Sequence, residues 1–125
     1  MTPLSAEHTP LRVFCLEDNP LIVFHLEHII EDLGHLFAGS AESFADLQTG
    51  WPTLRMDCAL IDIDLADGRT GPQAAAWLLA REVPVVFVTG QDQVAAEHAG
   101  TAVCVVSKPV SSASISEALG AVARL

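Results

Sequence analysis

Short apolar runs alternate along the chain with segments of helical periodicity. Residues 11–16, 58–63 and 83–88 are almost wholly apolar, and residues 35–41 and 102–106 form weaker runs. Runs of this length are typical of strands that are buried on both faces of a sheet. Between the runs, apolar residues recur every three or four positions, which indicates amphipathic helices. The pattern therefore predicts five strands that alternate with helices.

The expected helices carry start and stop signals at their ends. Pro20 and Pro72 stand in the first turns of two helices, where the missing proline N–H leaves no hydrogen bond unmade. Ser43 can cap another helix, and Gly34 follows the end of the first one. The helices are expected over residues 19–34, 44–48, 72–81, 91–99 and 112–123.

Strands and helices that alternate over short loops predict one α/β domain. Its sheet would be doubly wound, parallel and five-stranded, with helices on both faces. A chain of 125 residues has room for one such core. Residues 1–10 contain two prolines and little periodicity, so we expect a flexible N-terminal arm there and the folded domain over residues 11–125.

Charge and composition exclude several classes of partner. The chain has 16 acidic residues against 6 Lys and Arg, and this net charge of -10 disfavours direct contact with nucleic acid. No apolar run approaches the roughly 18 residues of a membrane span, and the N-terminus does not resemble a signal peptide. We therefore expect a cytoplasmic protein with no membrane contact. The three widely spaced cysteines are expected to be reduced thiols rather than a disulfide or a metal site.

Residues that can do chemistry stand at the ends of the expected strands. Glu17 and Asp18 follow the first strand, Asp62 lies at the end of the third, Thr89 follows the fourth, and Lys108 follows the fifth. The carboxyl ends of parallel strands meet at one edge of a sheet, so these side chains should converge. Three carboxylates repel one another unless a cation such as Mg²⁺ binds between them. A carboxylate beside Mg²⁺, a lysine and a hydroxyl is what phosphoryl transfer to an aspartate requires.

The motifs around these residues resemble those of receiver domains in two-component response regulators. The first strand leads into VFCLEDN, the third into ALIDIDLADG, the fourth into VVFVTG and the fifth into VVSKP. The four motifs occur in the family's order and extend over nearly the whole chain. The resemblance implies a CheY-like, flavodoxin-like (βα)5 fold and phosphorylation of an aspartate.

Roles for the acidic residues follow from this resemblance. Asp62 matches the phosphorylated aspartate, and Glu17 and Asp18 match the acidic pair that binds Mg²⁺. Asp64 matches the position whose backbone carbonyl also binds the metal. Its side chain would face the path of the attacking water, so we expect Asp64 to tune hydrolysis or to strengthen metal binding. Asp67, further along the loop, is expected to be a solvated turn residue.

The resemblance also assigns roles at the fourth and fifth strands, where the chain departs from the family. Thr89 matches the switch hydroxyl, Lys108 the lysine that pairs with the phosphoryl group, and Pro109 the proline that often follows a cis peptide bond. Val105 replaces the usual aromatic switch residue, and Ala66 the usual proline. The short span between Thr89 and Lys108 predicts an abbreviated fourth helix. The FVTG sequence loosely resembles the FATGUY receivers, a stand-alone group without the aromatic.

The resemblance implies a stand-alone signalling domain rather than an enzyme, with at most self-phosphorylation from small donors and autodephosphorylation. The expected phosphodonor is a sensor histidine kinase or a histidine phosphotransfer protein. The signal would pass to a downstream protein, or the phosphoryl group would pass onward, through a surface formed by residues 102–125 and the short fourth helix. The sequence leaves open whether a homodimer forms.

Two alternatives remain from the residues alone. The first is a receiver-like binding module that is not phosphorylated, which the missing aromatic and proline favour and the intact acid, hydroxyl and lysine set disfavours. The second is a phosphohydrolase of the haloacid dehalogenase type, with Asp62 as nucleophile and Asp64 as general acid and base. Against the second, the acidic pair precedes Asp62 and no suitable acid follows Lys108.

Overall fold

The structure is a computed structural model of the chain, and it describes residues 9–125. The N-terminal arm expected for residues 1–10 therefore lies, apart from its last two residues, outside the described part. Among the described residues, no helix is long and apolar enough to cross a membrane.

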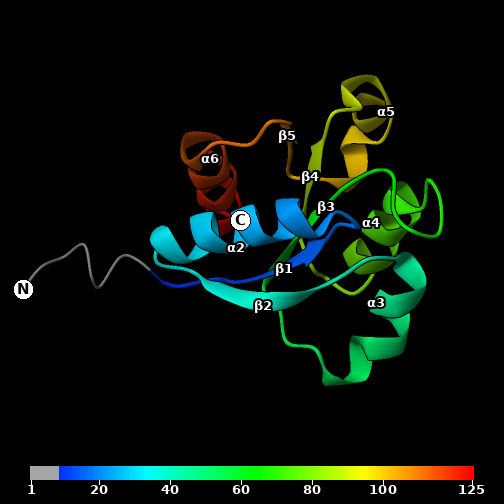
Figure 1. The fold of residues 1–125 in the computed structure, drawn as a ribbon, viewed down its shortest axis with the longest axis horizontal. Helices are drawn as coiled ribbons and strands as arrows, with labels where there is room; N and C mark the ends of the chain where they lie inside the picture. Colours follow the sequence, from blue (N-terminus) through cyan, green and yellow to red (C-terminus); the bar gives the residue numbers. More distant parts are fainter. Residues whose placement is uncertain (1–8) are drawn as a thin grey trace, which may run out of the picture.

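Five parallel strands form the sheet, in the order β2-β1-β3-β4-β5 (Figure 1). The predicted doubly wound α/β fold is thus confirmed. The strands are β1 (Arg12–Leu16), β2 (Leu36–Ala41), β3 (Cys58–Ile61), β4 (Val85–Thr89) and β5 (Cys104–Ser107). The described helices are α2 (Pro20–Asp32), α3 (Phe44–Gly50), α4 (Gly71–Leu79), α5 (Asp92–Glu97) and α6 (Ser112–Ala123), with short 3₁₀ turns η1 (Trp51–Thr53) and η2 (Ala99–Thr101).

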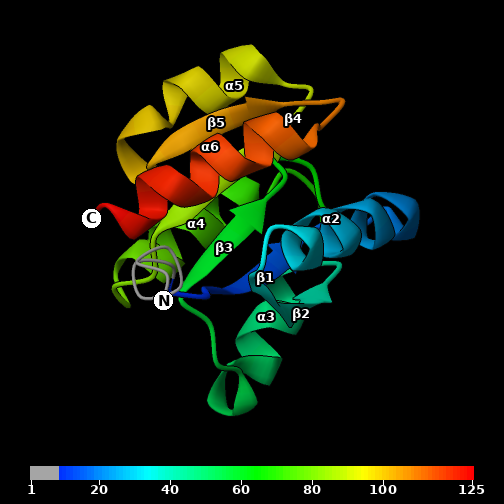
Figure 2. The same ribbon diagram turned by 90° about the vertical axis from the view of Figure 1, so that its left-hand side faces the viewer.

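The sheet separates two hydrophobic cores. Helices α2 and α6 cover one face, and α3, α4 and α5 cover the other (Figures 1 and 2). Along β1, Val13 and Cys15 point into the first core, whereas Phe14 and Leu16 point into the second. Successive strand residues point to opposite faces, so a sheet covered on both sides needs a continuous apolar run. This is the physical origin of the runs in the sequence.

Local capping explains where several helices begin. The Asn19 side chain accepts a hydrogen bond from the Leu21 backbone N–H at 3.0 Å, and Pro20 follows in the first turn of α2. The Ser43 hydroxyl accepts from the Asp46 N–H at 3.0 Å at the start of α3. These side chains satisfy N–H groups that have no partner within the helix.

Every strand has at least one boundary that differs from the predicted one by one or two residues, and two of these differences have a clear physical reason. The third strand was expected to run to Ile63 but ends at Ile61, where the chain turns out of the sheet while Ile63 stays buried. The fourth was expected from Val83 but begins at Val85. The Val83 N–H bonds to the Leu78 carbonyl at 3.0 Å and closes α4, and Glu82 adopts a positive φ of 63° there. An apolar run does not show which residues close the preceding helix.

The span between β4 and β5 holds a short helix, as predicted. Helix α5 has six residues, and only His98 separates it from the 3₁₀ turn η2. Cys15 and Cys58 are buried, Cys104 is partly buried, and none of the three forms a disulfide in the structure; that they are reduced thiols stays a prediction.

Candidate functional site

The expected chemical residues meet at the carboxyl edge of the sheet. Glu17 directly follows β1, Asp62 follows β3, Thr89 ends β4, and Lys108 follows β5. The Lys108 Nζ lies 2.8 Å from Glu17 Oε1 and 2.6 Å from Asp62 Oδ2. The fold thereby joins a lysine to carboxylates that are 91 and 46 positions away in the sequence.

Three carboxylates form a cluster beside this lysine. Glu17, Asp18 and Asp62 each offer one oxygen, and these oxygens lie within 4.8 Å of one another. Glu17 and Asp62 are only 3% and 9% exposed, whereas Asp18 is exposed. One lysine cannot neutralise three acids, and hard carboxylate oxygens at this spacing suit Mg²⁺. The donor set therefore fits a divalent cation.

Burial and hydrogen bonding shift the pKa values of Glu17 and Lys108 in opposite directions. Burial raises the pKa of Glu17, and this effect outweighs its hydrogen bond to Lys108 and its backbone contact with Asn19. Burial acts to lower the pKa of Lys108, but the hydrogen bonds to Asp62 and Glu17 prevail and raise it. The ammonium is thus held in its charged form at the mouth of the site.

The backbone fixes the carboxyl group of Asp62. Its Oδ1 accepts a hydrogen bond from the Ile63 N–H at 2.7 Å, while Oδ2 contacts Lys108. Gly71 packs directly against the same segment, where a Cβ atom would lie 2.1 Å from the Asp62 carbonyl oxygen. Only glycine permits this close approach.

The ends of β4 and β5 are joined next to the cluster. The Lys108 backbone N–H donates to the Thr89 carbonyl at 3.0 Å, and the peptide bond between Lys108 and Pro109 is cis. Thr89 is fully buried, and its Oγ1 accepts a hydrogen bond from the Gln91 N–H at 3.0 Å. The hydroxyl therefore lies at the end of the strand adjacent to β3 and is held by the turn that follows it.

The family model described as the response regulator receiver domain matches residues 13–120. The chain belongs to this family. Receiver domains are signalling domains rather than typical enzymes, and they generally bind Mg²⁺ at an acidic pocket, to which the carboxylate cluster corresponds. Family membership argues against the phosphohydrolase alternative. The resemblance to receiver domains that the four motifs indicated is confirmed.

Several relatives of this receiver carry the name PhyR. The Phyllosphere-induced regulator PhyR of Methylorubrum extorquens is 39% identical over 80 residues, which cover 62% of this chain and 30% of the relative. The solved receiver domain of Erythrobacter litoralis PhyR is 29% identical with a TM-score of 0.81, covering 90% of this chain and 89% of that one. The anti-anti-sigma factor PhyR of Bartonella quintana is 27% identical with a TM-score of 0.77, covering 95% of this chain and 51% of that one. The match thus covers from 30% to about half of the longer relatives.

The receiver holds Asp64 through two residues that the sequence analysis missed. Asp64 Oδ1 accepts a hydrogen bond from Arg69 Nε at 2.9 Å, and Asp64 Oδ2 accepts one from the Gln91 side-chain amide. The hydrogen bond from Arg69 is the main cause that lowers the pKa of Asp64. Arg69 lies on the same loop as Asp64, five positions later, and Gln91 lies on another loop, 27 positions away. Neither contact follows from a repeating spacing, so neither partner carried a signal in the sequence.

Asp67 is exposed in a turn, as expected, but its carboxylate also makes contacts that were not expected from the sequence. Its carboxylate accepts hydrogen bonds from the backbone N–H groups of Phe44 and Ala45 at 3.2 and 3.1 Å and from the Thr70 hydroxyl at 2.6 Å. Asp67 therefore caps α3 from a different loop and ties the segment after Asp62 to that helix.

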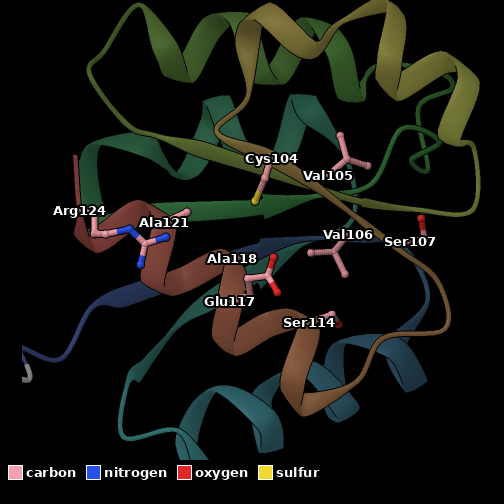
Figure 3. A pocket seen from close by; sticks show the side chains of 9 residues that line it. All are labelled: Cys104, Val105, Val106, Ser107, Ser114, Glu117, Ala118, Ala121 and Arg124. Carbon is pink, nitrogen blue, oxygen red and sulfur yellow. The ribbon is translucent and has the colours of Figure 1, made fainter.

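Val105, at the position of the missing aromatic, is 37% exposed, and its side chain points away from α6 (Figure 3). A groove of about 230 Å³ lies beside this residue, between β5 and α6. It is lined by Cys104, Val105, Val106, Ser107, Ser114, Glu117, Ala118, Ala121 and Arg124.

Proposed function

We propose that this receiver accepts a phosphoryl group on Asp62 from a sensor histidine kinase or a histidine phosphotransfer protein. The observation that carries this proposal is the Lys108 ammonium, which contacts both Asp62 and Glu17 beside a cluster of three carboxylates. Glu17, Asp18 and Asp62 would hold Mg²⁺ together with the backbone carbonyl of Asp64. The bound ion would supply positive charge to the oxygens of the transferring group.

The residues of the chain then have distinct tasks. A carboxylate oxygen of Asp62 attacks phosphorus, forming a P–O bond while the P–N bond to the donor imidazole breaks and the imidazole leaves with the electron pair. Lys108 offers its charge to the phosphoryl oxygens, and the buried Thr89 supplies a hydroxyl donor. The Ile63 N–H keeps Asp62 oriented. Asp64, beside the site, would tune hydrolysis of the acyl phosphate.

A surface beside Lys108 can admit a protein donor. Leu21 and Phe24 on α2 are 77% and 61% exposed, and a hollow of about 350 Å³ lies next to them. It is lined by Ile22, His25, Lys108, Pro109 and Val110. Exposed apolar side chains of this kind mark contact surfaces. We assign the approach of the phosphodonor to this face.

The output would pass through contacts with another protein. The groove between β5 and α6, together with α5, forms the surface assigned to a downstream partner or to a second copy of the receiver. The name of the Bartonella quintana PhyR, an anti-anti-sigma factor, denotes action on a protein, which supports an output of this kind. The acidic chain disfavours nucleic acid as a direct partner. The proposal includes a cytoplasmic location, which fractionation of cells would test.

Incubation with Mg²⁺ and a small acyl phosphate or amidophosphate donor tests the proposal. We expect a mass gain of one phosphoryl group that Asp62→Asn abolishes and that a chelator prevents. Asp46→Asn, an equal charge change on the exposed surface of α3, serves as the matched control and should retain the gain. If the wild-type chain gains no mass, the chain is instead a receiver-like binding module that is not phosphorylated.

A further inference from the structure

Gln91 connects the Thr89 hydroxyl, at the end of the strand adjacent to β3, with Asp64, two residues after Asp62. It stands in the turn between β4 and α5, where its backbone N–H donates to Thr89 Oγ1 at 3.0 Å. Its side-chain amide crosses to the loop after β3 and donates to Asp64 Oδ2, 27 positions away in the sequence. Gln91 thus connects the Thr89 hydroxyl, the loop that contains Asp64 and the start of α5.

Helix α5 depends on polar ties because little of it is buried. Of its six residues only Ala95 is fully buried, and Val94 is partly buried against the second core. Apart from the tie at Gln91, the Ser107 hydroxyl donates to Asp92 Oδ1 at 2.8 Å. The start of the helix is therefore held from two directions, by the loop after β3 and by the end of β5. A helix this short is not stable without such support.

Both partners of Gln91 are placed to respond to a phosphoryl group. The group would add negative charge two residues from the Asp64 carboxylate, and like charges at short range repel. It would also present oxygens that accept hydrogen bonds, and the Thr89 hydroxyl is a donor at the end of the neighbouring strand. Charge on Asp62 would therefore act on both ends of the Gln91 connection at once.

We propose that Gln91 is a positioning residue that holds the first turn of α5 against the site while Asp62 is unmodified and releases it when Asp62 carries a phosphoryl group. This inference rests on the phosphorylation proposed above. It provides a route from Asp62 to α5 through polar contacts, and that route does not use the position of Val105, where the aromatic switch residue is absent.

Hydrogen exchange of the full chain, followed by mass spectrometry, tests the route. In the wild-type protein, phosphorylation should speed exchange of the amides of residues 92–97 about fivefold, which corresponds to the loss of one hydrogen bond. In Gln91→Ala the exchange should already be about fivefold faster without phosphorylation, and phosphorylation should change it less than about twofold.

Ser107→Ala is the matched control, because it removes the other polar tie of the same helix. This variant should also exchange faster at residues 92–97, yet phosphorylation should still speed the exchange about fivefold since the Gln91 tie is intact. A merely structural role for Gln91 would make the two variants behave alike.

Different results would contradict the phosphorylation of Asp62 and the role of Gln91. If the wild-type mass does not rise with the phosphodonor, phosphorylation itself is wrong. If the mass rises but exchange at residues 92–97 does not change, or if Gln91→Ala responds to phosphorylation as fully as the wild type, the role of Gln91 is wrong. The comparison of unphosphorylated Gln91→Ala with wild type tests the tie itself and requires no phosphodonor.

Discussion

Two parts of the same sheet edge are held in different ways. At the ends of β1, β3 and β5, the nearly buried carboxylates of Glu17 and Asp62 meet Lys108 through two short ion pairs. At the end of β4, the partly exposed Gln91 and the short helix α5 are held by polar contacts near the surface. Buried charged groups are hard to separate, whereas exposed hydrogen bonds exchange readily with water. The carboxylates of Glu17 and Asp62 with Lys108, which would carry the chemistry, are therefore preorganised. Gln91 and helix α5, which would respond to phosphorylation, can change their contacts more easily.

Gly71→Ala is the strongest test of this difference. The added Cβ would lie 2.1 Å from the Asp62 carbonyl oxygen and 2.7 Å from the Ile63 Cα, both backbone atoms. We expect the free energy of unfolding in urea to fall by about 3 kcal/mol, because the backbone of Asp62 and Ile63 cannot move aside without disturbing the site. Gly90→Ala, next to Thr89, meets no atom within 4 Å and should change it by less than about 0.5 kcal/mol. Equal losses would contradict the contrast between the two parts.

Lys108→Gln removes the only cation that touches both buried carboxylates among the described residues. We expect phosphorylation of Asp62 by a small donor to slow about 100-fold, since an aligned charge at the reacting oxygens is lost. The rate of mass gain measures this effect. Arg55→Gln makes the same change in net charge at an exposed position and should leave the rate unchanged. A similar slowing in both variants would point to net charge instead.

Asp67→Ala tests the tie between the loop after Asp62 and helix α3. We expect a loss of about 1 kcal/mol in the free energy of unfolding at neutral pH, because two backbone N–H groups and the Thr70 hydroxyl lose their acceptor. These contacts, led by the Thr70 hydroxyl, lower the pKa of Asp67 in the folded state. Its stabilisation is therefore complete above the ordinary pKa of 3.8 and is lost as pH falls through the lowered folded value.

The pH series gives this prediction a clear contrary outcome. Unfolding curves of the wild type and Asp67→Ala should converge in acid below the folded pKa. A difference in stability that persists there unchanged would show that packing in the loop, rather than the ionised carboxylate, supports α3.

Val105→Ala should have the smallest effect of the series. Val105 is 37% exposed, so its truncation removes little buried area, and we expect a loss of about 0.5 kcal/mol or less in the free energy of unfolding. The rate of phosphorylation by a small donor should not change. A marked loss of phosphorylation would show that the Val105 position does influence the reaction at Asp62.

Much of the fold could be predicted because it depends on local composition. The runs around Cys15, Leu60 and Phe87 are apolar since strands covered on both faces bury every residue, and Asn19 and Ser43 mark helix starts through their own side chains. The place of Glu17, Asp62 and Lys108 at one edge followed from the rule that parallel strands share their carboxyl end. Their roles in phosphorylation remain predictions.

Other features could not be predicted because they depend on which loops lie side by side. The carboxylate of Asp67 reaches the N-terminus of α3 across 22 to 23 positions, and Gln91 reaches Asp64 across 27. Neither pair has a periodicity that a pattern of residues would show. The start of β4 was misplaced for a related reason, since Val83 is apolar whether it joins a strand or closes α4.

The amino-acid sequence by itself determined the alternation of strands and helices, the parallel sheet, and the set of acids, hydroxyl and lysine at strand ends. Each of these follows from a residue's own polarity and its position in a repeating element. Only the tertiary structure decided which atoms meet: Lys108 between Glu17 and Asp62, Gly71 against the Asp62 backbone, and Gln91 across to Asp64. These contacts join segments far apart in the chain, and their geometry is set by how the loops pack once the sheet has formed.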